Sequence, residues 1–143
     1  MKKIALTVLG LVVALVSIKA QGTITVIATD VESDKGEVYF MLHREADDTF
    51  PDGMEKSFQV IKKKAQKGDV AVSFENIPFG EYAISIAHDK DGNGEIKKSF
   101  IGMPKEPIGA SNMQRFGKPS WRKSKFQLTA EQSNLEHRMK FIN

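Results

Sequence analysis

The chain has 143 residues, of which 41% are hydrophobic and 27% are charged, and it contains no cysteine. This length fits one domain with a hydrophobic core of its own, and the lack of cysteine excludes disulfide bonds, cysteine-based catalysis and a lipid anchor on an N-terminal cysteine. The formal net charge of the whole chain is +3.

Residues 1–20 have the three parts of a secretory signal peptide. A basic start at Lys2 and Lys3 precedes an apolar run over residues 4–18, and the small residue Ala20 precedes Gln21. The apolar run is shorter than the roughly 20 residues that a membrane-spanning helix needs. We therefore expect a signal peptide over 1–20, one domain over 21–143, a secreted or periplasmic location, and no stable membrane anchor.

Removal of the signal peptide changes the charge balance of the chain. It takes away Lys2, Lys3 and Lys19, which leaves basic and acidic side chains equal in number, at 18 each. A formally neutral mature chain gives no electrostatic reason to bind nucleic acid, so nucleic acid is not an expected partner.

From Gln21 onward, apolar residues recur mainly at every second position, which is the period of half-buried strands. Seven segments show this alternation, with apolar positions within 24–28, 38–42, 58–60, 70–74, 82–86, 126–128 and 135–141. We expect the first two segments to form a hairpin across the turn-rich residues 32–36, and Pro78 with Gly80 to form the turn before the fifth. The pattern predicts an all-β fold, an immunoglobulin-like or transthyretin-like antiparallel β-sandwich of about seven strands.

Two stretches interrupt the strand rhythm. Residues 45–55 hold five acidic side chains and no basic one, and residues 97–125 hold eight basic side chains against one acidic one, Glu106. The whole connection from His88 to Lys125 is long for a loop, and long connections often carry function. We therefore expect the functional surface in the 88–125 connection.

Several segments resemble an uncharacterised bacterial family, DUF2141. They run from Asn76-Ile77-Pro78-Phe79-Gly80 through His88-Asp89 and Asp91-Gly92-Asn93-Gly94 to Phe100-Ile101-Gly102-Met103-Pro104, with further support from Gly109-Ala110-Ser111-Asn112 and from Arg115-Phe116-Gly117-Lys118-Pro119-Ser120. The resemblance implies an exported β-sandwich and no known activity. The chain departs from the family at Lys97, where members usually carry aspartate.

The glycine-rich stretch after His88 resembles the first half of an EF-hand-type calcium loop. Oxygen donors stand at alternate positions, Asp89, Asp91, Asn93 and the carbonyl of Glu95, and Gly94 occupies the sixth position. The ninth and twelfth positions are Lys97 and Phe100, which cannot replace the usual ligands, so a remote carboxylate from residues 45–52 would have to complete the site. The alternative is a plain turn whose side chains cap their own backbone. Calcium is the only cofactor that the sequence suggests.

Basic and aromatic side chains in the long connection suggest a surface for a polysaccharide or another anionic ligand. The candidate ligand-binding residues are His88, Arg115, Phe116, Lys118, Trp121 and Arg122. The alternative is a solvated loop in which Phe116 and Trp121 fold back on the end of the sandwich.

The sequence carries no pattern that identifies an enzyme. The three histidines lie in separate segments, and the trio His88, Asp89 and Ser111 matches no known nucleophile motif. We expect an exported envelope or extracellular accessory binding module that is not an enzyme. The alternatives are a structural β domain that docks on partners such as envelope proteins, and an unrecognised hydrolase.

Overall fold

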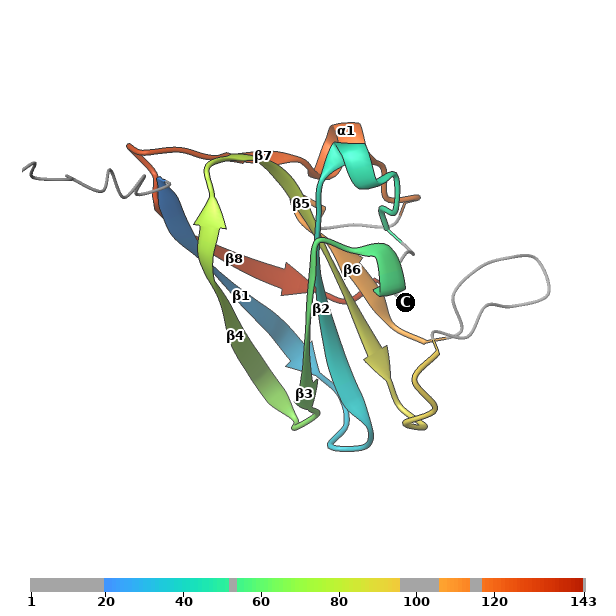
Figure 1. Cartoon of the computed structure of the whole chain (residues 1–143). Helices are drawn as coiled ribbons and strands as arrows, with labels where there is room; N and C mark the ends of the chain where they lie inside the picture. Colours follow the sequence, from blue (N-terminus) through green and yellow to red (C-terminus); the bar gives the residue numbers. More distant parts are fainter. Residues whose placement is uncertain (1–19, 52–53, 96–105, 114–116, 143) are drawn as a thin grey trace, which may run out of the picture.

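The computed structural model describes residues 20–51, 54–95, 106–113 and 117–142 (Figure 1). The predicted signal peptide lies outside these ranges except for Ala20. No helix within the described ranges has the length and the apolar character needed to span a bilayer. The elements in chain order are β1 (Gln21–Val31), β2 (Glu37–His43), η1 (Glu45–Asp47), η2 (Met54–Lys56), β3 (Gln59–Lys64), β4 (Gly68–Pro78), β5 (Gly80–Asp89), β6 (Ile108–Ala110), α1 (Trp121–Ser124), β7 (Phe126–Leu128) and β8 (Asn134–Lys140).

The strands form two sheets, which confirms the predicted all-β sandwich. One sheet has the order β4-β1-β8, and the other has the order β3-β2-β5-β6, with β7 also pairing with β5. All seven predicted strands are present. The eighth strand, β6, lies in the connection that we expected to be irregular, and its three residues are too few to display an alternation.

The predicted hairpin between the first two strands is wrong. β1 pairs with β4 and β8, whereas β2 pairs with β3 and β5, so the turn-rich residues 32–36 carry the chain from one sheet to the other. The pairing of β1 with β8 is parallel, so the smaller sheet is mixed and not wholly antiparallel. Alternation shows which face of a strand is buried, but it does not identify the neighbouring strand.

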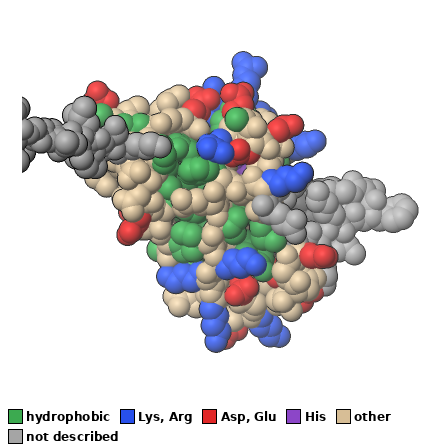
Figure 2. All heavy atoms as spheres, in the orientation of Figure 1, with side chains coloured by type: hydrophobic (Ala, Val, Ile, Leu, Met, Phe, Trp, Pro, Cys, Tyr) green, Lys and Arg blue, Asp and Glu red, His purple; other side chains and the backbone are tan. Residues whose placement is uncertain are grey.

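The core fills the space between the sheets, and it lies along alternate positions of each strand. Its fully buried side chains include Ile24, Val26, Val38, Phe40, Leu42, Phe74, Ile84 and Ile86. Burial of one such aliphatic or aromatic side chain contributes about 1.5–3 kcal/mol. In Figure 2, acidic and basic side chains mix on the visible surface, which agrees with the neutral charge of residues 21–143.

The outer face of the five-stranded sheet is also covered. Tyr39, Met41 and Ala87 form a second buried cluster there, with Met54 and Ile108 packed against it. β5 is therefore buried on both of its faces from Tyr82 to Asp89. As a result, two polar side chains at the end of this strand, His88 and Asp89, lie within the protein.

Candidate functional site

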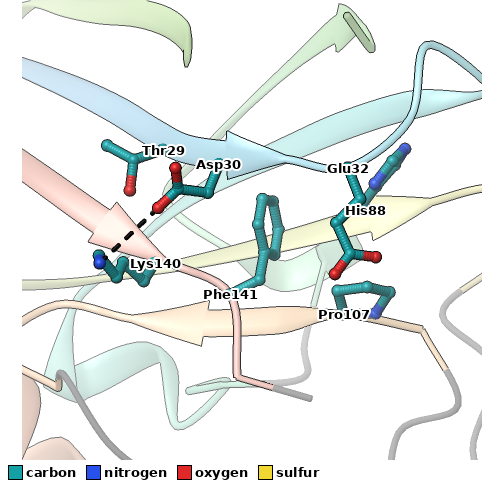
Figure 3. Close-up of a pocket in the computed structure, with 7 residues that line it drawn as sticks. All are labelled: Thr29, Asp30, Glu32, His88, Pro107, Lys140 and Phe141. Carbon is teal, nitrogen blue, oxygen red and sulfur yellow. Dashed lines mark ion pairs between the residues drawn. The ribbon is translucent and has the colours of Figure 1, made fainter. Parts of the chain in front are cut away.

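The end of β5 gathers the polar groups that are best placed for function. The loop between β1 and β2, the start of β6 and the end of β8 all meet it there (Figure 3). His88 and Asp89 are consecutive, so their side chains point to opposite faces of the sheet. Both are buried, with relative exposures of 1% and 0%. The strand end therefore presents an imidazole on one face and a carboxylate on the other.

The carboxylate of Asp89 closes the glycine turn. Its Oδ1 accepts a hydrogen bond from the N–H of Gly92 at 2.9 Å, and its Oδ2 accepts one from the N–H of Gly94 at 2.8 Å. Oδ2 also accepts a hydrogen bond from the hydroxyl of Tyr39 at 3.1 Å. Gly92 and Gly94 have positive φ angles of 69° and 79°, a conformation that glycine adopts without steric cost. These contacts are the ones expected of a plain turn whose side chains cap its own backbone, which was the alternative to a calcium loop.

Two further predicted calcium ligands also accept hydrogen bonds from the backbone of the turn. Asn93 Oδ1 accepts a hydrogen bond from the N–H of Glu95 at 2.8 Å, and Asp91 Oδ1 accepts one from the N–H of Asn93 at 3.3 Å. A carboxylate or amide oxygen has two lone pairs, so it can accept a backbone hydrogen bond with one and coordinate a cation with the other. The turn and a bound cation are therefore compatible. Lys97 and Phe100, the unfavourable ninth and twelfth positions, lie outside the described residues.

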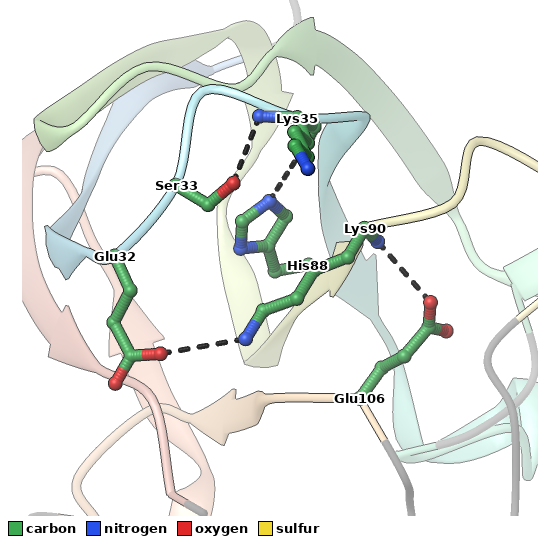
Figure 4. A network of polar contacts seen from close by, with 6 residues as sticks. All are labelled: Glu32, Ser33, Lys35, His88, Lys90 and Glu106. Carbon is green, nitrogen blue, oxygen red and sulfur yellow. Dashed lines mark hydrogen bonds and ion pairs between the residues drawn. The ribbon is translucent and has the colours of Figure 1, made fainter.

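A carboxylate that the sequence did not single out completes an acidic cluster. Carboxylate oxygens of Asp89, Asp91 and Glu106 lie within 4.8 Å of one another. Glu106 stands just before β6 and is 7% exposed, and its Oε1 accepts a hydrogen bond from the N–H of Lys90 at 3.1 Å (Figure 4). Carboxylate oxygens are the ligands that calcium prefers. These three residues could hold a divalent cation.

Of the remote carboxylates predicted to complete the calcium site, Asp52 lies outside the described residues, and Glu45, Asp47 and Asp48 lie elsewhere. Residues 45–51 follow the end of β2, where His43 pairs with Ala83, whereas Asp89 pairs with Glu37 at the other end of the same ladder. Six residues of strand separate Ala83 from Asp89, which is about 20 Å. Glu106 takes the place that we expected for one of these carboxylates.

On the opposite face of β5, the imidazole of His88 lines a small pocket. Its Nε2 lies 2.8 Å from the carbonyl oxygen of Lys35, and because a carbonyl only accepts, Nε2 carries the proton and donates (Figure 4). The pocket has a volume of about 120 Å³ and is lined by Thr29, Asp30, Glu32, His88, Pro107, Lys140 and Phe141 (Figure 3). Nδ1 is left as the acceptor of the neutral ring.

Ion pairs flank this pocket. Lys140 Nζ lies 3.7 Å from Asp30 Oδ2 (Figure 3), and Lys90 Nζ lies 3.4 Å from Glu32 Oε2 (Figure 4). All four side chains are substantially exposed, so each pair contributes about 0–1 kcal/mol to stability. The pairs matter more for the charge of the pocket, which they balance.

The structure separates His88 from Trp121, another predicted ligand-binding residue. Trp121 packs edge-on against Phe50 at 6.3 Å between ring centroids, and Phe50 packs against His43 near the start of β5. Trp121 thus folds back on the sandwich, as the alternative interpretation expected. Among the remaining candidates, Lys118 and Arg122 are exposed, and Arg115 and Phe116 lie outside the described residues.

Ser111 has a structural role. Its hydroxyl is fully buried, accepts a hydrogen bond from the N–H of Ile84 at 2.9 Å and donates one to the carbonyl of Ser124 at 2.6 Å. Ile84 lies four residues before His88 on β5, so the trio His88, Asp89 and Ser111 does not assemble. Ser111 instead fastens α1 to the five-stranded sheet.

A second buried histidine was not among the candidates. His43 Nε2 lies 2.7 Å from Ser85 Oγ, and its Nδ1 lies 3.0 Å from Thr49 Oγ1. Because the Ser85 hydroxyl donates to the carbonyl of Pro51 at 3.0 Å, it accepts from His43, and the Thr49 hydroxyl donates to Nδ1. This network holds residues 49–51 on the outer face of the sheet. The position of His43, in phase with Tyr39 and Met41, was the available signal.

The comparisons with known proteins agree with the expected resemblance. A family model described as "Uncharacterized protein conserved in bacteria (DUF2141)" matches residues 26–136. No curated protein and no solved structure matches the chain. The matched range runs from β1 into β8 and includes both the turn after β5 and Glu106. The chain therefore belongs to the DUF2141 family.

Proposed function

We propose that the protein is an exported accessory binding module in which the turn after β5 binds calcium. The observation that carries this proposal is the convergence of Asp89, Asp91 and Glu106, whose carboxylate oxygens lie within 4.8 Å of one another. Two unit charges at that distance repel by about 3–4 kcal/mol at an effective dielectric constant near 20. A divalent cation between the carboxylates replaces this repulsion with attraction.

The composition of the cluster supports calcium over a softer metal ion. Three carboxylates supply only oxygen, and calcium takes roughly six to eight oxygen ligands, some of them from water. Asp91 is exposed, which leaves room for water in the coordination shell, while Asp89 and Glu106 are buried and fixed in position. With three protein carboxylates, we expect the dissociation constant of an extracellular module, about 0.1–1 mM.

Thermal unfolding of the purified protein with and without calcium tests this proposal. At about 10 mM calcium and a dissociation constant of about 1 mM, binding to the folded state adds about 1.4 kcal/mol of stability and raises the melting temperature. Glu106→Gln and Asp91→Asn should each remove most of the rise, because each deletes one ligand charge. Glu32→Gln, outside the cluster, should keep it.

Two outcomes would contradict the calcium proposal. One is the absence of any calcium-dependent rise in the wild-type protein, with calorimetry showing no heat of binding. The other is an undiminished rise in folded Glu106→Gln. Magnesium serves as the comparison ion, because its demand for a tight octahedral shell should give a smaller rise.

Export is the second part of the proposal, and the tripartite start of the chain supports it. β1 begins at Gln21, the first residue after the expected cleavage point. Mass spectrometry of the protein recovered outside the cytoplasm should find a mature chain that starts near Gln21. An intact Met1 on that protein would contradict cleavage.

The docking and hydrolase alternatives have weaker support. β3 is an edge strand of the larger sheet, but it presents Lys62, Lys63 and Lys64, and lysines on an edge disfavour the addition of another strand. The serine that a hydrolase would use, Ser111, is fully buried and bonded to backbone groups.

A further inference from the structure

The acceptor nitrogen of His88 has a fixed direction and faces the pocket. The bond from Nε2 to the carbonyl of Lys35 orients the ring, and in Figure 4 the second ring nitrogen points toward the side where Glu32 lies. Within the described residues, Nδ1 forms no hydrogen bond. Nδ1 is not among the fully buried unpartnered atoms of the described residues, so solvent can reach it, and an occupant that displaces this solvent has to donate a hydrogen bond in its place. The pocket therefore favours an occupant that donates a hydrogen bond to Nδ1.

The size and walls of the pocket limit this occupant to the end of a molecule. A volume of about 120 Å³ equals that of about four water molecules in the liquid. The ring of Phe141 and Pro107 supply apolar walls, and the Phe141 ring centroid lies 6.1 Å from that of His88 (Figure 3). A group with both C–H and O–H bonds can contact the apolar walls and donate to Nδ1 together.

The charges around the pocket favour a neutral occupant. Asp30 and Glu32 would repel an anion, and their paired lysines, Lys140 and Lys90, would repel a cation. Each carboxylate oxygen keeps lone pairs that accept further hydrogen bonds. His88, Asp30 and Glu32 offer hydrogen-bond acceptors, and each of the two carboxylates is paired with a lysine. This combination suits a ligand that carries several hydroxyl groups and no charge.

We propose that this pocket binds the end of a neutral, hydroxyl-rich ligand, namely the terminal residue of a glycan. The site uses the face of β5 opposite Asp89 and shares no side chain with the acidic cluster. It is therefore independent of calcium binding, and either proposal can fail alone.

Titration of the ¹⁵N-labelled protein with neutral methyl glycosides of glucose, galactose and N-acetylglucosamine tests the proposal. We expect saturable shifts of the amide signals of residues 29–32, 88 and 141 with a dissociation constant of about 1–10 mM, the range of a ligand that buries only its end. Acetate and methylammonium, a small anion and a small cation, should give no saturable shift at the same concentrations.

His88→Gln is the decisive variant. The amide N–H of glutamine can still donate to the carbonyl of Lys35, but no acceptor remains at the position of Nδ1. Glycoside affinity should fall at least tenfold, whereas His137→Gln, on the smaller sheet, should leave it unchanged. Phe141→Leu, which keeps the apolar volume and removes the ring, should weaken binding severalfold and tests the wall separately.

Three results would overturn the proposal. The first is no saturable shift with any of the three glycosides in the wild-type protein. The second is unchanged glycoside affinity in both His88→Gln and Phe141→Leu, with amide spectra that show each variant folded. The third is tighter binding of acetate or methylammonium than of every glycoside, which would mean that the pocket selects charge.

Discussion

Tyr39 and Asp89 lie on neighbouring strands and share a buried hydrogen bond of 3.1 Å, in which the tyrosine hydroxyl donates to Oδ2 of the carboxylate. The other two donors to Asp89 are backbone N–H groups of the turn itself. Tyr39 therefore supplies the side-chain link between the outer face of the five-stranded sheet and the glycine turn.

Tyr39→Phe should destabilise the protein by about 1.5–3 kcal/mol, because it deletes a hydrogen bond to a buried charged group. Tyr82→Phe is the matched control. The Tyr82 hydroxyl donates to the neutral carbonyl of Pro78 at 2.7 Å, and its loss should cost only about 0.5–1.5 kcal/mol. Urea unfolding at neutral pH measures both. Equal losses in the two variants would show that the charge of Asp89 adds nothing.

The same contact predicts a loss of stability in alkali. Burial and the hydrogen bond to Asp89 raise the pKa of Tyr39 from 10.0 to about 12. Because the folded protein holds this proton more tightly than the unfolded chain, the stabilisation is complete below about pH 10 and is lost as the pH rises toward about 12. Unfolding free energies measured across this interval should fall more steeply in the wild type than in Tyr39→Phe. Parallel curves would contradict the prediction.

His137 should make the protein less stable in mild acid. Its ring packs on Phe126 at 4.2 Å between centroids, its Nε2 is buried with no partner in the described residues, and burial lowers its pKa below 6.5. The unfolded chain then binds more protons than the folded one, so stability is full above about pH 6.5 and falls as the pH drops toward the lowered pKa.

The variant His137→Phe isolates this effect, because it keeps an aromatic ring against Phe126 and removes the titration. Melting temperatures between about pH 8 and about pH 5 should fall less in the variant than in the wild type. The same acid-induced fall in both proteins would assign it to other groups.

Gly109 on β6 has no room for a side chain. A Cβ atom there would lie 2.4 Å from the carbonyl oxygen of Lys140 and 2.9 Å from Cγ1 of Ile86. Gly109→Ala should therefore cost about 1–3 kcal/mol by forcing β6 away from β8. At Gly80 the nearest atom is 3.7 Å away, on Tyr82, so Gly80→Ala should be neutral or stabilise by about 0.4–1 kcal/mol. Denaturant midpoints of the two variants in opposite order would contradict this account.

The alternation of apolar residues was enough to predict the fold class. It located seven strands, and the burial expected of a half-buried strand appears at every second position of 24–28, whereas 38–42 is buried on both faces. It did not predict the strand pairing, since β1 pairs with β4 and β8, which lie far from it in the chain. It also missed β6, whose two neighbours in the described residues, β5 and Ile142 after β8, are far away in the chain.

The candidate site was predictable only where its residues are close in sequence. Asp89 and Asp91 follow the spacing of a calcium loop, but Glu106 reaches them from the start of β6 and has no local pattern. The pocket beside His88 was even less predictable from local sequence patterns than the acidic cluster. Phe141 and Lys140 line this pocket because β8 pairs with β1, and no local sequence pattern predicts that pairing.

The parallel pairing of β1 with β8 also sets a condition on when the protein can fold. Residues 23–29 obtain one of their two neighbouring strands from residues 134–140, which a ribosome makes after the segments that form the other described strands. Pairings between such distant segments form slowly, because the intervening chain loses much entropy when its ends meet. Until then β1 has an uncovered edge, so the smaller sheet cannot be completed. If the chain is exported as we propose, this late step helps to keep it unfolded, and thus able to cross a membrane, while it is being made.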